Sequence, residues 1–197
     1  MAQARREQLR QALADEAERV IAERGLSALK ARELAEAVGC AVGAIYTAYP
    51  DLDSLVLEVN RRTLLLFENA LSAGDEDDPV RALVSLGLGY LAFAREHRER
   101  WRALFQHRLA EDRAPPDWYL AEQGRLFRHI EEPLRRLRPD LDDQARALLA
   151  RSLFSATHGL VSLGLDEKLM ALPPAVLEGQ VRLVVQAAAR GLGAAWT

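Results

Sequence analysis

The sequence has few of the residues that cross-link a chain or interrupt helices. Cys40 is the only cysteine among 197 residues, so no disulfide can form within the chain, and we expect a reducing compartment. The 12 glycines and 8 prolines are sparse and clustered. The first residues are polar and lack the apolar run of a secretory signal, so we expect a cytoplasmic protein.

Long hydrophobic runs, metal-ligand spacings and catalytic motifs are also missing. The uncharged stretch at residues 152–165 is shorter than the about 20 apolar residues that cross a bilayer. The acidic run at 75–78 lacks the glycine and closing glutamate of a calcium loop, so we expect Asp78 to cap a helix with Pro79 in its first turn. The histidines are isolated, and no nucleophile elbow, phosphate-binding glycine loop or dinucleotide fingerprint occurs. We therefore expect neither a membrane protein nor an enzyme, and no cofactor or metal.

What the sequence does contain is typical of helices. Apolar residues make up 49% of the chain and charged residues 28%, and alanine, leucine, arginine and glutamate dominate. Breaks rich in glycine, proline and aspartate separate about nine segments of helical periodicity. The predicted fold class is all-α, with a small helical domain at residues 1–50. A larger helical domain at 51–197 begins with a linking helix at about 52–73.

A helix-turn-helix pattern occupies residues 31–48. Small and aliphatic residues stand where the two helices pack together, at Leu34, Ala35, Val38 and Ile45. Gly39 lies between the helices, where the turn needs the left-handed conformation that glycine adopts readily. The second helix, predicted at residues 42–48, has a length that fits the major groove of DNA. Pro50 ends it, and Asp51 is placed to cap the next helix.

The same stretches resemble a known family. Residues 34–39 (LAEAVG), 43–46 (GAIY) and 49–55 (YPDLDSL) are similar to the signature of the DNA-binding domain of the TetR family of bacterial transcriptional regulators. The resemblance covers residues 5–60, and the total length also fits. It implies three helices for DNA, a linking fourth helix, and a larger helical domain that binds a small molecule and a second subunit.

Some residues depart from the family's pattern. Members usually carry a hydroxyl residue, a threonine and a lysine where this sequence has Ala41, Ala44 and Leu52. Residues 1–60 also carry seven basic and ten acidic side chains, a net charge of −3, which disfavours binding to phosphates. Two interpretations follow. Either the acidic residues point away from the duplex and DNA binding is retained, or the chain is a dimeric small-molecule-binding or adaptor protein with a degenerate helix-turn-helix. We favour the first.

On the first interpretation, the small residues of the reading helix contact bases through methyl groups, and basic and tyrosine side chains contact phosphates. The predicted DNA-binding residues are Arg5, Lys30, Arg32, Ala41, Val42, Gly43, Ala44, Tyr46, Thr47 and Tyr49. The predicted partner is a near-palindromic double-stranded operator. Cys40 is interpreted as a packed residue of the turn.

Aromatic residues concentrate in the middle of the chain, and we predict that they line a pocket for a small hydrophobic organic ligand. The predicted ligand-binding residues are Phe93, Trp101, Phe105, Trp118, Tyr119, Phe127, Phe154 and His158. The alternative is that these rings fill an ordinary core. Residues 156–163 resemble the Trp-His-Gly motif of one C-terminal domain type in the TetR family, with Thr157 in place of tryptophan.

The last two predicted helices, about 142–165 and 174–193, are apolar around much of their circumference. Such helices must be covered on both sides, so we expect a homodimer with a two-fold four-helix interface. The predicted interface residues are Ser155, Gly159, Ser162, Leu163, Val181, Val184 and Ala188. The sequence as a whole predicts a ligand-responsive regulator, a repressor that a small molecule releases from its operator through the linking helix.

Overall fold

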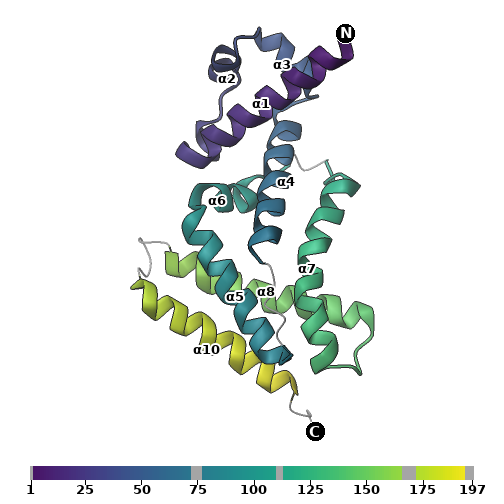
Figure 1. Ribbon diagram of the computed structural model, residues 1–197, viewed down its shortest axis with the longest axis vertical. Helices are drawn as coiled ribbons and strands as arrows, with labels where there is room; N and C mark the ends of the chain where they lie inside the picture. Colours follow the sequence, from purple (N-terminus) through teal and green to yellow (C-terminus); the bar gives the residue numbers. More distant parts are fainter. Residues whose placement is uncertain (1, 72–76, 110–112, 166–171, 194–197) are drawn as a thin grey trace. The chain divides into compact units, whose positions relative to one another are not determined.

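The computed structural model describes residues 2–71, 77–109, 113–165 and 172–193. In these ranges the chain forms nine α-helices and one short 3-10 helix, and no strand (Figure 1). The prediction of an all-α fold with about nine helices is confirmed.

The helices fall into two compact units that interleave in the sequence. Unit 1 contains residues 1–66 and 97–122, and unit 2 contains residues 67–96 and 123–197. Two helices, α4 (Leu52–Ala70) and α7 (Asp117–Leu137), contribute residues to both units. The second half of the chain therefore supplies part of unit 1, which the periodicity of the sequence does not reveal.

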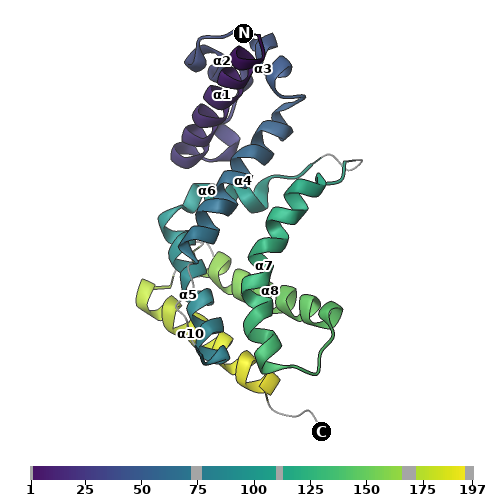
Figure 2. The ribbon, with the colours of Figure 1, turned by 45° about the vertical axis from the view of Figure 1, so that its right-hand side comes forward.

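Unit 1 is built around the long helix α1 (Ala2–Arg24). Its fully buried residues recur every four positions at Leu13, Ala17 and Ile21, which gives one apolar stripe along the helix. α1 packs against α2 (Ala31–Val38), α3 (Val42–Ala48), α6 (Arg98–Gln106) and the 3-10 helix η1 (Leu26–Ala28). The three N-terminal helices can be followed in Figure 2. This apolar stripe therefore forms the part of the core against which α2 and α3 pack.

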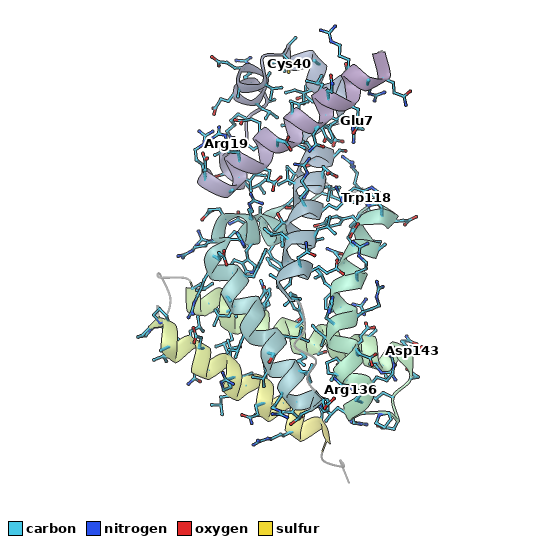
Figure 3. All side chains as sticks on the ribbon, in the orientation of Figure 1. Glu7, Arg19, Cys40, Trp118, Arg136 and Asp143 are labelled. Atoms are coloured by element: carbon cyan, nitrogen blue, oxygen red, sulfur yellow. The ribbon has the colours of Figure 1, made fainter. Side chains whose placement is uncertain are left out.

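The turn between α2 and α3 has the predicted conformation. Gly39 has φ 73° and ψ 36°, in the left-handed region that favours glycine. Its N–H donates to the Glu36 carbonyl at 3.1 Å, and the Cys40 N–H donates to the Ala35 carbonyl at 2.9 Å, which closes the end of α2. Cys40, which is labelled in Figure 3, is half-buried.

Two aspartates cap helices as the sequence predicts. The Ser54 N–H donates to Asp51 Oδ1 at 2.7 Å, at the start of α4. The Val80 N–H donates to Asp78 Oδ1 at 2.8 Å, at the start of α5 (Pro79–Glu96). The first two residues of the predicted acidic run, Asp75 and Glu76, lie outside the described residues.

Unit 2 brings α5 together with α8 (Asp143–Leu165) and α10 (Pro174–Gly193). Glycine allows close approach where α10 crosses its neighbours. A Cβ at Gly87 would lie 3.1 Å from Val185 Cγ2, and a Cβ at Gly164 would lie 2.5 Å from Leu177 Cδ1. By length and composition α8 alone among the described helices could span a membrane, and it packs against α5 and α10 in unit 2.

Candidate DNA-binding and ligand-binding surfaces

The short helix α3 presents small side chains to solvent. Ala41, Val42, Gly43 and Thr47 are exposed, and Tyr46 is 50% exposed. Ala44 is half-buried, while Ile45 and Ala48 point into the core of unit 1. The exposed face of α3 therefore consists of methyl groups, one glycine, one hydroxyl and one phenol, which leaves it narrow enough for a groove in DNA.

Tyr49 has a role other than the predicted one. Its side chain is 3% exposed, and its hydroxyl donates to the Arg10 carbonyl at 3.2 Å. The Arg10 guanidinium lies 4.3 Å from the centroid of the Tyr49 ring and also donates to the Ala48 carbonyl. Burial raises the pKa of the Tyr49 phenol. Tyr49 therefore fastens the end of α3 to α1, and it is not available to a phosphate.

Four exposed cations lie on or beside α1 and α2, the helices that pack against α3. Lys30 precedes α2 and Arg32 lies in its first turn, and both side chains are exposed. Arg5 and Arg6 are exposed near the start of α1. These four charges are suited to phosphates on either side of a groove.

The acidic residues of α1 are held by arginines, several of which come from outside the first 60 residues. Arg62 Nη1 lies 2.7 Å from Asp15 Oδ1 and 2.9 Å from Glu18 Oε2. Arg100 Nη1, on α6, lies 2.5 Å from the other oxygen of Glu18. The charges of α1 that face α4 and α6 are thus neutralised within unit 1.

Glu58 on α4 belongs to the same network. Burial would raise the pKa of this carboxyl, but hydrogen bonds from Arg61 and Arg62 outweigh that effect and lower it. On an exposed side of α1, Arg19, which is labelled in Figure 3, pairs with Glu16 and Glu23 at 2.6 Å each. Each of these carboxylates therefore has a cation beside it.

The net charge of the DNA-binding part changes once tertiary structure defines it. The residues of unit 1 include fourteen basic and fifteen acidic side chains, a net charge of −1 rather than the −3 of residues 1–60. The difference comes from arginines after residue 60, including Arg62, Arg100 and Arg113. The acidic excess that disfavours DNA is therefore smaller than the sequence suggests.

The predicted aromatic pocket residues are divided between the units. Trp101, Phe105, Trp118 and Tyr119 belong to unit 1, and Phe93, Phe127, Phe154 and His158 belong to unit 2. In unit 1 the rings of Trp101 and Phe105 make an edge contact with centroids 5.7 Å apart. Trp101 is buried, whereas Trp118, labelled in Figure 3, is exposed. The predicted pocket as a whole therefore stays a prediction.

The unit 2 rings form a connected cluster that includes two residues missed by sequence reasoning, Phe67 and Tyr90. Ring centroids of successive members lie 4.7–5.6 Å apart in the pairs Phe93–Phe67, Phe67–Tyr90, Tyr90–Phe154 and Phe154–Phe127. The helical periodicity of residues 79–96 contains the missed signal, because Tyr90 lies on the buried face of α5 with Gly87 and Leu91. We call these five residues and His158 the unit 2 aromatic cluster.

The cluster contains one polar pair. Tyr90 Oη and His158 Nδ1 are hydrogen-bonded at 2.6 Å, and the His158 ring stacks on Phe154 with centroids 5.8 Å apart. Burial lowers the pKa of His158 below the ordinary value, so the imidazole is neutral at pH 7. Phe67, Tyr90 and Phe93 are buried, whereas Phe127, Phe154 and His158 are only partly buried and form the accessible side of the cluster.

The predicted dimer residues lie on α8 and α10, but they do not share one environment. Leu163 is 52% exposed and Val184 is 36% exposed. Ser155 is exposed, and Gly159, Ser162 and Ala188 are partly buried. Val181 is a correction, since it is fully buried and packs beside Gly87 of α5 within unit 2. Leu148 and Leu183, which were not in the predicted set, are 66% and 58% exposed.

No group of three or more histidine, cysteine, aspartate or glutamate side chains that could hold a metal occurs within residues 2–71, 77–109, 113–165 and 172–193. The geometry of the described chain thus centres on α3 and on the unit 2 aromatic cluster.

Comparison with protein families gives two matches. Residues 13–59 match the family described as bacterial regulatory proteins, tetR family, and residues 83–188 match the family described as tetracyclin repressor-like, C-terminal domain. A search of curated proteins finds no match. The resemblance to the Trp-His-Gly domain type stays a prediction.

Solved structures have the same fold at low sequence identity. A protein of unknown function from Rhodococcus sp. RHA1 superimposes with a TM-score of 0.72 at 21% identity, covering 94% of this chain and 96% of that one. A tetR-family transcriptional regulator from Streptomyces coelicolor gives a TM-score of 0.69 at 21% identity, with 97% of this chain and 84% of that one covered. The regulator PfmR from Thermus thermophilus gives 0.58 at 19% identity, with 90% and 97% covered.

Proposed function

Because the chain belongs to the TetR family of bacterial regulatory proteins, and is thus a DNA-binding transcriptional regulator, we propose that it is a cytoplasmic repressor. It binds a near-palindromic operator as a homodimer, and a small hydrophobic molecule releases it. The family is one of regulators rather than enzymes. The observation that carries the proposal is the exposed face of α3. The opposite face of this helix is anchored in the core of unit 1 by Ile45 and Tyr49, and the turn at Gly39 precedes it.

In the proposed complex, different residues of unit 1 contact the bases and the phosphates of DNA. The exposed residues Val42, Gly43 and Thr47 enter the major groove, where methyl groups contact thymine methyls. Tyr46, Lys30 and Arg32 bind phosphates on either side and fix the register of the helix. Tyr49 is buried and orients α3 through its hydrogen bond to α1, so we no longer include it among the residues that contact DNA.

A salt titration tests this assignment. An operator is selected from random duplexes with the wild-type chain, and its dissociation constant is measured by fluorescence anisotropy at several salt concentrations. Lys30→Gln weakens binding and reduces the slope of log K against log salt by about one unit, because one phosphate contact is lost. Arg19→Gln is the matched control, since its charge is already paired with Glu16 and Glu23. Failure of the wild type to select any sequence at low salt supports the degenerate adaptor instead.

Dimerisation rests on the apolar exposure of α8 and α10. Leu148, Leu163 and Leu183 expose more than half of their side chains, which is unusual for leucine on helices that also form a core. The same faces of a second subunit cover them in a two-fold interface. Two copies of unit 1 in one dimer then read half-sites about one helical turn, roughly 34 Å, apart.

Charged variants separate the interface from the core. Val184→Asp gives a folded monomer by sedimentation, because Val184 lies at the surface. Val181→Asp instead unfolds unit 2, because Val181 is fully buried beside Gly87. A normal dimer for Val184→Asp contradicts the proposed interface.

Ligand binding is proposed at the accessible side of the unit 2 aromatic cluster. The partly buried rings of Phe127, Phe154 and His158 offer apolar area, and neutral His158 adds one polar group without a charge. The ligand class that fits is an uncharged aromatic or aliphatic molecule. Binding that favours a conformation unable to hold the operator lowers the population on DNA by linkage.

The neutral apolar dye N-phenylnaphthylamine tests the ligand site. Phe154→Ala weakens dye binding about tenfold, since removal of one aromatic contact and its area costs about 1.4 kcal/mol. Trp118→Ala, which removes an exposed ring of unit 1, leaves binding unchanged. Equal losses in the two variants contradict a site confined to unit 2.

A further inference from the structure

Two aspartates stand at the start of α4, immediately after the DNA-reading helix. Asp51 and Asp53 flank the uncharged Leu52, so this stretch alone contributes two negative charges. Adjacent Cα atoms are about 3.8 Å apart, so Asp51 lies within about 11 Å of Ala48, the last residue of α3. That distance is comparable to the screening length of about 10 Å at 0.1 M salt, so phosphates that bind at the end of α3 experience these charges.

Both aspartates are engaged by side chains from the distant stretch that follows α6. Arg113 Nη1 lies 2.5 Å from Asp51 Oδ2 and 3.8 Å from Asp53 Oδ2. His107 Nε2 lies 3.0 Å from Asp53 Oδ1, and the histidine side chain is 8% exposed. The contacts lie entirely within unit 1. One arginine therefore bridges the two carboxylates, and a buried histidine holds the second of them in place.

The arrangement neutralises Asp51 without removing its structural task. Oδ1 of Asp51 accepts the Ser54 N–H and caps α4, while Oδ2 accepts from Arg113. Burial would raise the pKa of Asp51, but the hydrogen bonds from Ser54 and Arg113 outweigh that effect, so the carboxyl stays ionised. Its charge must then be balanced by a cation, or it repels the phosphates beside α3.

We infer that Arg113 is part of the DNA-binding surface, as a positioning residue that neutralises Asp51 and Asp53 beside the reading helix. This inference rests on the proposed operator binding and goes beyond the helix-turn-helix, because Arg113 is separated from Asp51 by 62 residues. Arg113 acts through the aspartates. Removal of its charge leaves Asp51 and Asp53 without this cation, close in the chain to the end of α3.

A double-mutant cycle tests the inference with the operator duplex selected by the wild type. Arg113→Gln raises the dissociation constant about threefold to tenfold at 50 mM salt, as expected when one charge near several phosphates is uncovered. Arg113→Lys stays within about twofold of the wild type, because the charge is kept. In the Asp51→Asn/Asp53→Asn background, Arg113→Gln changes the constant by less than about twofold. Asparagine at position 51 still caps α4, so the helix is preserved.

A control variant and the results that would overturn the inference can be stated in advance. Arg135→Gln removes an exposed ion pair with Glu132 in unit 2 and leaves affinity unchanged. Thermal melts of every variant verify folding. An unchanged constant for Arg113→Gln overturns the inference, and so does an equal loss in both backgrounds, which identifies a direct phosphate contact. Absence of any operator preference in the wild type refutes the proposed function itself and is seen before the variants are compared.

Discussion

Two tyrosines three residues apart provide the sharpest test of how unit 1 is organised. Tyr46 is 50% exposed on α3, whereas Tyr49 is 3% exposed and hydrogen-bonded to α1. Substitution of Tyr46 should therefore affect operator affinity with little change in stability, and substitution of Tyr49 should do the opposite. The two effects can be measured on the same four variants.

The magnitudes follow from the contacts. Tyr49→Phe loses one hydrogen bond to the Arg10 carbonyl, which costs about 0.5 to 1.5 kcal/mol. Tyr49→Ala also loses a buried ring, which costs about 3 to 5 kcal/mol and lowers the melting temperature by roughly 6 to 20 °C for a chain of this size. Tyr46→Ala and Tyr46→Phe change stability by at most about 0.5 kcal/mol.

Circular-dichroism melts and operator anisotropy well below the melting temperature distinguish the two roles. We expect Tyr46→Ala and Tyr46→Phe to weaken operator binding and Tyr49→Phe to bind normally. If Tyr49→Phe lost affinity without loss of stability, its phenol would reach DNA and the buried placement would be refuted. A large drop in melting temperature for Tyr46→Ala would equally contradict the exposed face of α3.

Other predictions concern packing and charge. Gly87→Ala should destabilise the chain by about 1 to 3 kcal/mol in urea denaturation, because its Cβ would lie 3.1 Å from Val185 Cγ2. Gly124→Ala, with no neighbour within 4 Å of its Cβ, should be neutral or stabilising, and equal effects would contradict the close crossing of α5 and α10. The lowered pKa of Glu58 means that its charge stabilises the fold above its unfolded value of about 4.5 and that this contribution is lost as pH falls further. Glu58→Gln should therefore melt lower at pH 7 and lose less stability on acidification, whereas parallel curves would count against the network. The ring of His158 should titrate below 6.5 by NMR, and a higher midpoint would contradict its desolvation.

Local signals in the sequence were sufficient for much of unit 1. The turn at Gly39 and the cap at Asp51 depend on a few neighbouring residues, so their chemistry can be read directly. The role of Tyr49 could not be predicted from neighbouring residues, because it depends on Arg10, which is 39 residues away. The negative charge of the DNA-binding part was overstated for the same reason, since Arg100 and Arg113 reach it only through tertiary structure.

The aromatic residues show a second limit of sequence reasoning. Proximity along the chain suggested one pocket, whereas Trp101 and Trp118 belong to unit 1 and Phe93 and Phe127 belong to unit 2. Hydrophobic character indicates that a ring is buried but not which helices bury it. The helical pattern does place Tyr90 on a buried face, but its pairing with His158 depends on how α8 packs.

The convergence of Asp15, Glu18 and Glu58 on Arg62 limits the order in which these positions can change. Loss of any one of the acids still leaves the guanidinium with two partners, so such a replacement is mild. Loss of the arginine first removes a cation from three carboxylates at once, although Arg100 and Arg61 still lie beside Glu18 and Glu58. An engineer who wants an apolar seam there must therefore replace the acids before the base.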